Sequence, residues 1–379
     1  DFVNSRQLDP RITFSRTSGA TYLNPDTGLI TTASDHEARF EKEGLLVEES
    51  GTNLITYSEQ FDNAAWQKGG CTVTANATES PDGTTTADLI VEDNANSEHK
   101  ATFNAGYSTN PRYFSFFAKP AGRNIVVANV SGVGGATFHL TNNTAVSGQS
   151  FPCRIDILQN GWRRCSVYYS SIAPAPQIML SDDGAFPFTY QGDGASGIYL
   201  WGAQLQELKS TLTSYIPTAG STVTRSADIA QVRDQNMTSW YNQSEGTFAF
   251  EYNAPNQLGA VAQMVWTARS TNSVARWDFY TGSSGTSSAT FDSSNGRACA
   301  FLTRAQAVSG KYAWAAKKDS FALSQNGNAA LTDNSGDMNS TNQITTLLFG
   351  SGNYLNGHIS RLAYYSRRLS DSELQTITL

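Results

Sequence analysis

Hydrophobic and polar residues alternate in short runs along most of the chain, which predicts β-strands rather than helices. Between residues 53 and 206 these runs are separated by prolines and glycines, as expected for strands joined by turns. The segments predicted as strands in this part are residues 113–119, 125–130, 137–141, 154–158, 163–170, 177–180 and 198–205. Short strands at such intervals are typical of an antiparallel β-sandwich or jelly roll.

A second alternating series runs from residue 237 to residue 379. Near residue 278, Trp277 and Phe279 fall on one face of a predicted strand, because successive side chains of a strand point to opposite faces. The residues on the other face are Arg276, Asp278 and Tyr280. Further on, Asn326 and Gly327 predict a hairpin turn. The series therefore predicts a second antiparallel sandwich.

The end of the sequence predicts a short capped helix. Ser370 is placed to cap the helix, and Glu373 stands three residues later to complete a capping box. Leu369 and Leu374 occupy the positions of the hydrophobic contact that accompanies such a cap.

The two predicted sandwiches meet at an abrupt change in composition. The apolar run 198–205 predicts a strand buried on both faces, and it is followed by a polar stretch that contains Pro217 and Gly220. We therefore predict an all-β fold of two sandwiches in tandem, 53–206 and 237–379, joined by a linker at 207–236. Residues 1–52 hold too few apolar residues for a core, so they predict an arm of short strands and loops on the next domain or on a neighbouring subunit.

Composition narrows the classes of partner. The net charge is -7 and only 16% of the 379 residues are charged, whereas binding to a phosphate backbone requires clustered Lys and Arg. We therefore expect no nucleic-acid partner. No apolar run approaches the roughly 20 residues that a membrane span needs, so we expect no membrane-spanning segment.

The cysteines do not predict a disulfide framework. Cys153 and Cys165 flank Asn160 and Gly161, which predict a two-residue turn. That turn would place Cys153 opposite Tyr168, so the two thiols would be out of register and too far apart to bond.

Several ordered sequence blocks resemble bacteriophage tail, fibre and capsid-decoration proteins. The blocks are residues 11–30, 44–66, 160–170 and 197–228. This resemblance implies a protein of the virion surface, a homo-oligomer with a trimer favoured, in contact with other virion proteins and with host cell-surface polysaccharide.

Within these blocks, the sequence YSEQF followed by Trp66, and the final IYLWGAQL, resemble jelly-roll carbohydrate-binding modules appended to xylanases and glucanases. Such modules commonly hold a structural calcium between an early acidic residue and an Asp of the last strand. Glu59 matches the first position, but Trp201 and Gly202 stand where the second carboxylate would be. That calcium site is incomplete, and we predict no cofactor.

Residues 245–379 resemble laminin-G-like and pentraxin-like lectin domains of the concanavalin-A-like superfold, mainly through the ending 355–379. This superfold also hosts enzymes, so catalysis has to be argued from residues. Glucanases of this superfold carry an E-x-D-x-x-E strand and serine hydrolases a G-x-S-x-G turn, and neither pattern is present. We therefore predict a protein that is not an enzyme and has no catalytic residues.

Acidic residues gather near the start of the chain without the spacing of a metal site, and they are interpreted as a solvated surface. They are Asp35, Glu41, Glu43, Glu48 and Glu49.

Glycan recognition remains the leading hypothesis, because aromatic faces stack on sugar rings and planar polar groups bind hydroxyls. The candidate ligand-binding residues in irregular stretches are Trp66, Tyr190, Trp240, Tyr241, Asn353 and Tyr354. Arg276, Asp278 and Tyr280 are candidates on a strand face, with a surface salt bridge beside a solvent-facing tyrosine as the alternative. Trp201, Trp277 and Trp314 are expected in the cores. A purely structural virion component and a polysaccharide-degrading enzyme remain the alternative functions.

Overall fold

A computed structural model describes most of the chain. The described residues are 1–106, 108, 110–130, 134–148, 151–170, 175–186, 188–207, 211–254, 263–271, 273, 275–282, 285–292, 297–304, 309–336, 338, 343–350 and 355–379, with the backbone alone described from 281 to 304. The regular secondary structure of these residues is almost entirely β-strand, as predicted. The α-helices among them are α1 (Phe2–Ser5), α2 (Gln235–Thr238) and α3 (Asp371–Ile377). None of these helices has the length and hydropathy that crossing a bilayer requires.

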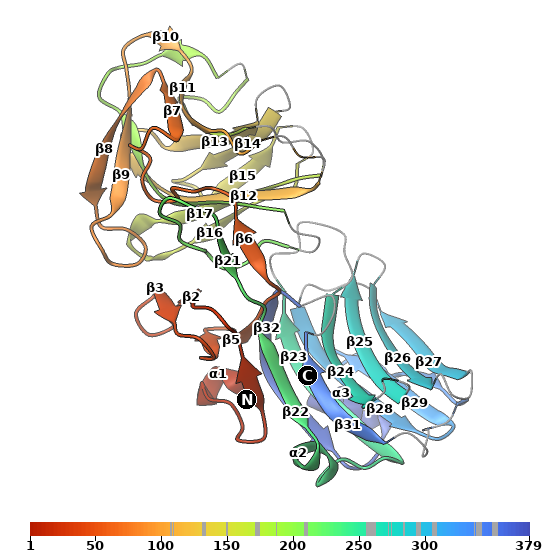
Figure 1. Ribbon diagram of the computed structural model, residues 1–379. Helices are drawn as coiled ribbons and strands as arrows, with labels where there is room; N and C mark the ends of the chain where they lie inside the picture. The colour runs from red at the N-terminus through yellow and green to blue at the C-terminus, as the bar shows by residue number, and fades with distance from the viewer. Residues whose placement is uncertain are drawn as a thin grey trace. The chain divides into compact units, whose positions relative to one another are not determined.

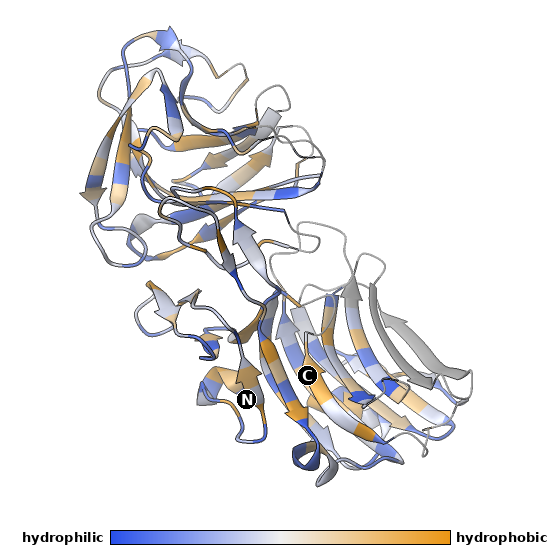
Figure 2. Cartoon of the chain, in the orientation of Figure 1, coloured by the Kyte–Doolittle hydropathy of each residue, from blue (hydrophilic) through white to orange (hydrophobic). Residues whose placement is uncertain are grey.

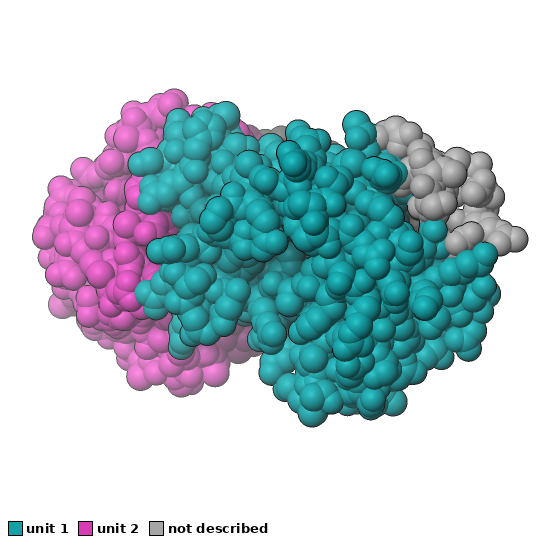
Figure 3. All heavy atoms as spheres, turned by 90° about the horizontal axis from the view of Figure 1, so that it is seen from below, with its two compact units in different colours: residues 1–19, 33–50, 226–379 teal, residues 20–32, 51–225 magenta. Residues whose placement is uncertain are grey.

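The chain divides into two compact units, coloured separately in Figure 3. Unit 1 contains residues 1–19, 33–50 and 226–379, and unit 2 contains residues 20–32 and 51–225. This division differs from the predicted arm and linker. Strands of the predicted arm and of the predicted linker belong to the sheets of unit 1, because the backbone groups of such short strands find hydrogen-bond partners only in a larger sheet.

Unit 2 contains two six-stranded antiparallel sheets (Figure 1). The first has the order β15 (Thr144–Ser147), β14 (Gly134–His139), β13 (Ile125–Val130), β18 (Pro176–Ser181), β11 (His99–Phe103), β7 (Trp66–Gly69). The second has the order β16 (Cys153–Ile157), β17 (Arg163–Tyr169), β12 (Arg112–Ala121), β20 (Gly197–Gln206), β9 (Ala87–Glu92), β8 (Cys71–Thr78). A single large cluster of buried apolar side chains draws on both sheets. All seven strands predicted between residues 53 and 206 are present within a few residues of their predicted bounds.

The strand β20 has both faces buried, as its apolar sequence predicted. Ile198 and Leu200 belong to the core between the sheets, while Trp201 packs with Phe117 and Tyr215 in a second cluster on the other face. Gly202 adopts a left-handed conformation with a φ of 61°, beside a shift in register between β12 and β20. Such a bulge changes which residues of the strand face the core, so Ala203 and Leu205 follow Ile198 and Leu200 into it.

The hairpin of β16 and β17 corrects the predicted turn. The turn contains the three residues of a short 3-10 segment, Gln159–Gly161, instead of two. Cys153 therefore lies opposite Val167, and Cys165 lies opposite Ile155. The two cysteines are still out of register with each other, and both are free thiols.

Unit 1 contains two seven-stranded antiparallel sheets. The first has the order β1 (Thr13–Ser15), β22 (Ile229–Arg233), β31 (Ile344–Phe349), β24 (Gln263–Ser270), β25 (Ala275–Gly282), β26 (Gly285–Asp292), β27 (Arg297–Arg304). The second has the order β30 (Leu331–Asp333), β29 (Ser320–Gln325), β28 (Ser309–Lys317), β23 (Glu245–Asn253), β32 (Gly357–Tyr365), β5 (Gly44–Val47), β4 (Arg39–Glu41). Figure 2 shows both hydrophobic and hydrophilic residues along those strands of these sheets that it colours by hydropathy.

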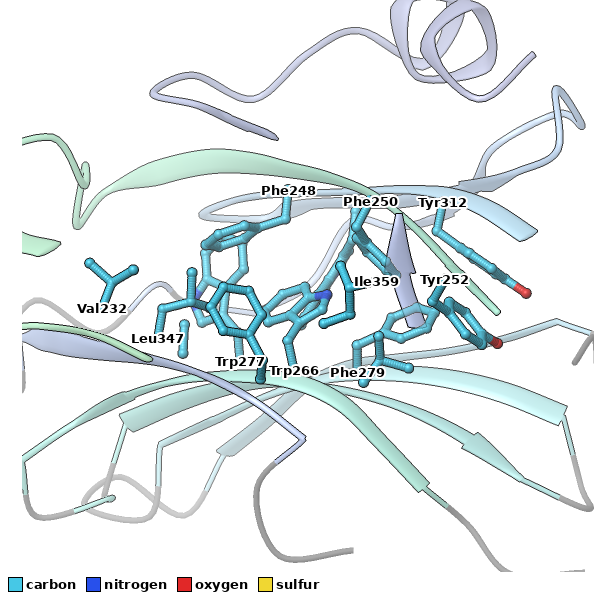
Figure 4. Packing of buried hydrophobic residues seen from close by; sticks show 14 of the residues in the cluster. Val232, Phe248, Phe250, Tyr252, Trp266, Trp277, Phe279, Tyr312, Leu347 and Ile359 are labelled. Atoms are coloured by element: carbon cyan, nitrogen blue, oxygen red, sulfur yellow. The ribbon is translucent and has the colours of Figure 1, made fainter. Parts of the chain in front are cut away.

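The core of unit 1 is rich in aromatic residues. Figure 4 shows Phe248 and Phe250 of the second sheet meeting Trp266, Trp277 and Phe279 of the first. Trp277 and Trp314 are buried here and Trp201 is buried in unit 2, as predicted.

Shorter pairings complete the described fold. They are β2 (Ala20–Leu23) with β3 (Ile30–Ala33), β6 (Gly51–Asn53) with β21 (Val223–Arg225), and β10 (Asn96–Ser97) with β19 (Tyr190–Gln191).

The predicted helix cap and the predicted turn are both confirmed. Ser370 and Glu373 form the capping box of α3, and Leu369 and Leu374 are buried in one small cluster. Asn326 and Gly327 have φ values of 48° and 71° in the turn after β29, the positive values for which these two residue types are suited.

Candidate functional site

The two candidate ligand-binding residues of unit 2, Trp66 and Tyr190, are both buried. Trp66 is fully buried in the core, and its indole N–H donates to the carbonyl oxygen of Tyr57 over 2.8 Å. Tyr190 is 7% exposed, and its hydroxyl donates to the carboxylate of Glu92. The guanidinium of Arg123 lies 5.0 Å from the centre of the Tyr190 ring. These two rings therefore present no free face to a ligand.

The strand β25 brings its predicted candidates together, but they bind one another. Trp277 and Phe279 point into the core as predicted, and the polar face carries Arg276, Asp278 and Tyr280. The Nε of Arg276 lies 2.9 Å from the carboxylate of Asp278, and the hydroxyl of Tyr280 donates to the same carboxylate over 3.1 Å. The alternative offered from the sequence was a surface salt bridge beside a solvent-facing tyrosine; the salt bridge is present, but Asp278 is buried and Tyr280 is partly buried and bound to it.

Asp278 also accepts a hydrogen bond from a residue of the neighbouring strand. The hydroxyl of Thr267 in β24 donates to its carboxylate over 2.6 Å. Burial raises the pKa of Asp278, and the hydrogen bond from Thr267 and the charge of Arg276 partly oppose that rise. Of the remaining candidates, Asn353 and Tyr354 lie outside the described residues.

The neighbouring residues Trp240 and Tyr241 have different surroundings. Tyr241 is buried among the aromatic rings of the core of unit 1. Trp240 is half-buried, with its ring centre 5.0 Å from that of Tyr364 and 5.7 Å from the guanidinium carbon of Arg11. Its indole N–H donates to the carbonyl oxygen of Asn236. Only Trp240 of this pair stands where a ligand can reach it.

Trp240 lines a pocket of about 740 Å³ in unit 1. The pocket lies between the segment that begins with α1 and parts of both sheets, because its lining comes from residues 1–12, β22, β31, β23 and β32. Its aromatic lining residues are Phe2, Trp240, Phe248, Phe349 and Tyr364. Its polar lining residues are Asp1, Ser5, Gln7, Asp9, Arg11 and Ser366.

The polar side of the pocket is held in place by a close ion pair. The Nε of Arg11 donates to Asp9 over 2.8 Å, and a second guanidinium nitrogen lies 2.7 Å from the other carboxylate oxygen. The hydrogen bond from Arg11 lowers the pKa of Asp9 to about 2. The carboxylate of Asp1 accepts a hydrogen bond from the backbone N–H of Asn4 and so caps α1. The guanidinium of Arg11 is thereby paired with Asp9 while it lies over the ring of Trp240.

Sequence reasoning found Trp240 but missed its partners. Asp9 and Arg11 belong to the segment predicted as an arm, and Tyr364 lies in a strand near the other end of the chain. No local pattern connects these residues, because the fold alone brings the segments together.

Not all of the acidic residues near the start of the chain lie on a solvated surface. Glu48 is buried and lies 2.8 Å from a guanidinium nitrogen of Arg39. Arg39 also pairs with the buried carboxylate of Asp228, which lies 3.0 Å from Arg16. The predicted solvated surface is therefore wrong for Glu48, because its charge is neutralised inside unit 1 by an arginine of the same hairpin.

Comparisons with known proteins add similarities of architecture. No protein-family model matches the chain, and no curated protein matches it. Among solved structures, it is similar to a Ruminococcus gnavus IT-sialidase CBM40 bound to alpha2,3 sialyllactose, with 18% identity, a TM-score of 0.32, and coverage of 37% of this chain and 85% of that one. It is also similar to the CBM22-1-CBM22-2 tandem domain of Paenibacillus barcinonensis Xyn10C, with 10% identity, a TM-score of 0.26, and coverage of 84% of this chain and 99% of that one.

Proposed function

We propose that this protein is a non-enzymatic component of a bacteriophage surface that binds host glycan, and that the pocket beside Trp240 receives the sugar. The observation that carries the proposal is a half-buried indole that lines a pocket beside the ion pair of Asp9 and Arg11. Aromatic rings stack on the C–H faces of sugars, while carboxylate and guanidinium groups bind their hydroxyls.

The size of the pocket supports this proposal. Its volume of about 740 Å³ falls within the roughly 300–1,000 Å³ of small-molecule sites, which combine an apolar lining with a few placed polar groups. The ion pair between Asp9 and Arg11 is already formed, so little side-chain ordering opposes binding.

The state of the pocket carboxylates supports binding without cleavage. Glycoside hydrolysis needs one carboxyl group with a raised pKa to protonate the leaving oxygen. The pKa of Asp9 is instead lowered to about 2 by Arg11, and the carboxylate of Asp1 caps a helix. Both groups are suited to accepting hydrogen bonds from a ligand.

The assignment to a bacteriophage virion draws on the sequence blocks around residues 11–30, 44–66, 160–170 and 197–228. We propose a homo-oligomer, with a trimer favoured, because cyclic symmetry closes repeated interfaces. Light scattering tests this assembly over a wide concentration range. A trimer mass supports the virion proposal, and a constant monomer mass contradicts it.

The binding test uses a glycan array probed with the purified chain and with Trp240→Ala. We expect the wild type to bind at least one glycan and Trp240→Ala to lose about tenfold or more in affinity, because it removes the stacking face. Tyr280→Ala is the matched control, since it removes a partly buried ring of unit 1 that does not line the pocket.

The outcomes separate the three functions. Equal binding by wild type and Trp240→Ala contradicts the proposed site. Absence of binding to every glycan favours the purely structural alternative. New reducing ends or unsaturated products after incubation with host polysaccharide show an enzyme, and they contradict the non-enzymatic proposal.

A further inference from the structure

A tight turn in unit 1 is held against the strand β32. Glu41 at the end of β4 pairs with Gly44 at the start of β5, so only Lys42 and Glu43 form the turn. The hydroxyl of Ser360 in β32 donates to the carbonyl oxygen of Glu43 over 2.6 Å.

Gly44 makes this close approach possible. Its φ is 122°, and a Cβ atom there would stand 2.4 Å from the carbonyl oxygen of Ile359. An L side chain is excluded by both the conformation and the space. The turn is therefore fixed with Glu41 and Glu43 beside β32.

His358 in β32 faces these two carboxylates. Its Nε2 lies 2.8 Å from the carboxylate of Glu41, and its side chain is 9% exposed. Among the described residues its Nδ1 has no hydrogen-bond partner, so the buried imidazole is bound by nothing outside this group. One donor atom each of Glu41, Glu43 and His358 lie within 4.8 Å of one another.

Charge makes this group unusual. Two carboxylates share the site with one imidazole, and the nearby Glu48 is already paired with Arg39. Carboxylates held this close repel one another unless a proton or a cation lies between them. The donor atoms of Glu41, Glu43 and His358 are also the types that bind metals in proteins.

We propose that Glu41, Glu43 and His358 bind a divalent transition-metal ion. Ligand atoms about 2.0–2.2 Å from a metal lie at most about 4.4 Å from one another. In a tetrahedral site the three ligand atoms would lie roughly 3.4 Å from one another, so the side chains of Glu41, Glu43 and His358 would shift from their present positions to surround the ion. One imidazole nitrogen with two carboxylates suits zinc or manganese, whereas calcium and magnesium prefer oxygen ligands alone.

Three protein ligands would leave at least one coordination position open to water or to another ligand. The site uses none of the residues that line the pocket beside Trp240. It is therefore independent of the proposed glycan binding, and either proposal can fail without the other.

Calorimetric titration of the chelator-treated full chain tests the metal site, with Zn²⁺, Mn²⁺, Ca²⁺ and Mg²⁺ added separately. We expect one Zn²⁺ or Mn²⁺ per chain and no saturable binding of Ca²⁺ or Mg²⁺. Glu43→Gln should weaken binding about tenfold or more, because even outer-shell changes at metal sites cost that much. The side chain of Glu43 is not buried, so this variant should fold.

Glu37→Gln is the control, since it removes an exposed carboxylate from the same segment outside the group. It should bind as the wild type does. Anomalous scattering from zinc-soaked crystals should place the metal between Glu41, Glu43 and His358. No saturable binding of Zn²⁺ or Mn²⁺, unchanged affinity in Glu43→Gln, or a metal peak elsewhere would each overturn the proposal.

Discussion

The two units are both antiparallel sandwiches, but they place their aromatic residues differently. In unit 2, Trp66 and Tyr190 are closed off by the core and by the contacts of Glu92 and Arg123. In unit 1, Trp240 and Tyr364 line a pocket that also contains charged side chains. Aromatic content alone therefore does not identify a binding unit, and the proposal for unit 1 rests instead on an aromatic ring beside an accessible pocket.

The units also differ in how the chain builds them. Unit 2 consists of residues 20–32 and 51–225, whereas unit 1 needs three segments from both ends of the sequence. The pocket of unit 1 depends on this, because its ion pair comes from the first segment and Trp240 from the last. A site assembled in this way is sensitive to changes far from it in sequence.

The largest expected difference between the units concerns two tryptophans. Trp66→Ala should lower the free energy of unfolding by about 3–5 kcal/mol, because it empties a fully buried site. Trp240→Ala should cost only about 1 kcal/mol, since its ring is half-buried. Urea unfolding measures both values. A larger loss for Trp240→Ala would mean that this ring belongs to the core rather than to a binding pocket.

The buried charges give the next comparison. Asp228→Ala should cost about 3–5 kcal/mol, because it leaves Arg16 and Arg39 buried without their shared carboxylate. Glu92→Gln in unit 2 should cost about 1.5–3 kcal/mol, the usual range for hydrogen bonds to a charged group. Denaturant titration at neutral pH measures the free energy of unfolding of both variants. If Asp228→Ala unfolds no more easily than the wild type, the ion pairs do not hold unit 1 together.

One buried carboxylate of each unit should respond to acid in the opposite direction to the other. Burial works against the charge of Glu92, but hydrogen bonds from Arg123 and Tyr190 lower its pKa. Ionised Glu92 therefore stabilises the folded state at pH values above about 4.3, the pKa of a glutamate in the unfolded chain. This stabilisation is lost as the pH falls through the lower pKa that Glu92 has in the folded protein. Burial raises the pKa of Asp278 in unit 1, so its contribution is present at low pH and is lost as the pH rises through the folded value.

Two variants test these opposite signs. Glu92→Gln should reduce the loss of stability between about pH 5 and pH 3. Asp278→Asn should change stability at pH 7 by less than about 0.5 kcal/mol or raise it, because it removes a buried charge. Thermal unfolding across this pH range measures both. Identical pH profiles for the two variants would contradict the assigned directions.

The smallest expected effect concerns the capped helix of unit 1. Ser370→Ala should cost about 1 kcal/mol, because it removes the acceptor for the backbone N–H of Glu373. Ser372→Ala in the same helix serves as the control and should stay within about 0.5 kcal/mol of the wild type. An equal loss in both variants would show that the hydrogen bond of the cap does not account for the change.

Local patterns predicted most of the fold. The period-two alternation located the strands around Trp277 and Phe279, and the spacing of Ser370 and Glu373 located the cap, because both depend on residues close in sequence. The turn at Asn160 was predicted one residue too short. A left-handed Asn followed by Gly suits two-residue and three-residue turns alike.

The candidate sites could be predicted only in part. Trp240 was selected for lying outside the strands, but the same reasoning selected Trp66, which is buried. Burial depends on the opposite sheet, and sequence alone does not reveal which residues that sheet contributes. The contact of Glu41 with His358 was missed for the same reason, since β4 and β32 come from opposite ends of the chain.

A crystal structure of the full chain with a bound oligosaccharide tests the central claim most directly. The glycan would be the one selected by the array, soaked at a concentration well above its dissociation constant. We predict a sugar ring stacked on Trp240, with hydroxyl groups within hydrogen-bond distance of Asp9 or Arg11. A sugar bound only to unit 2, or in unit 1 away from Trp240, would contradict the assignment of this pocket.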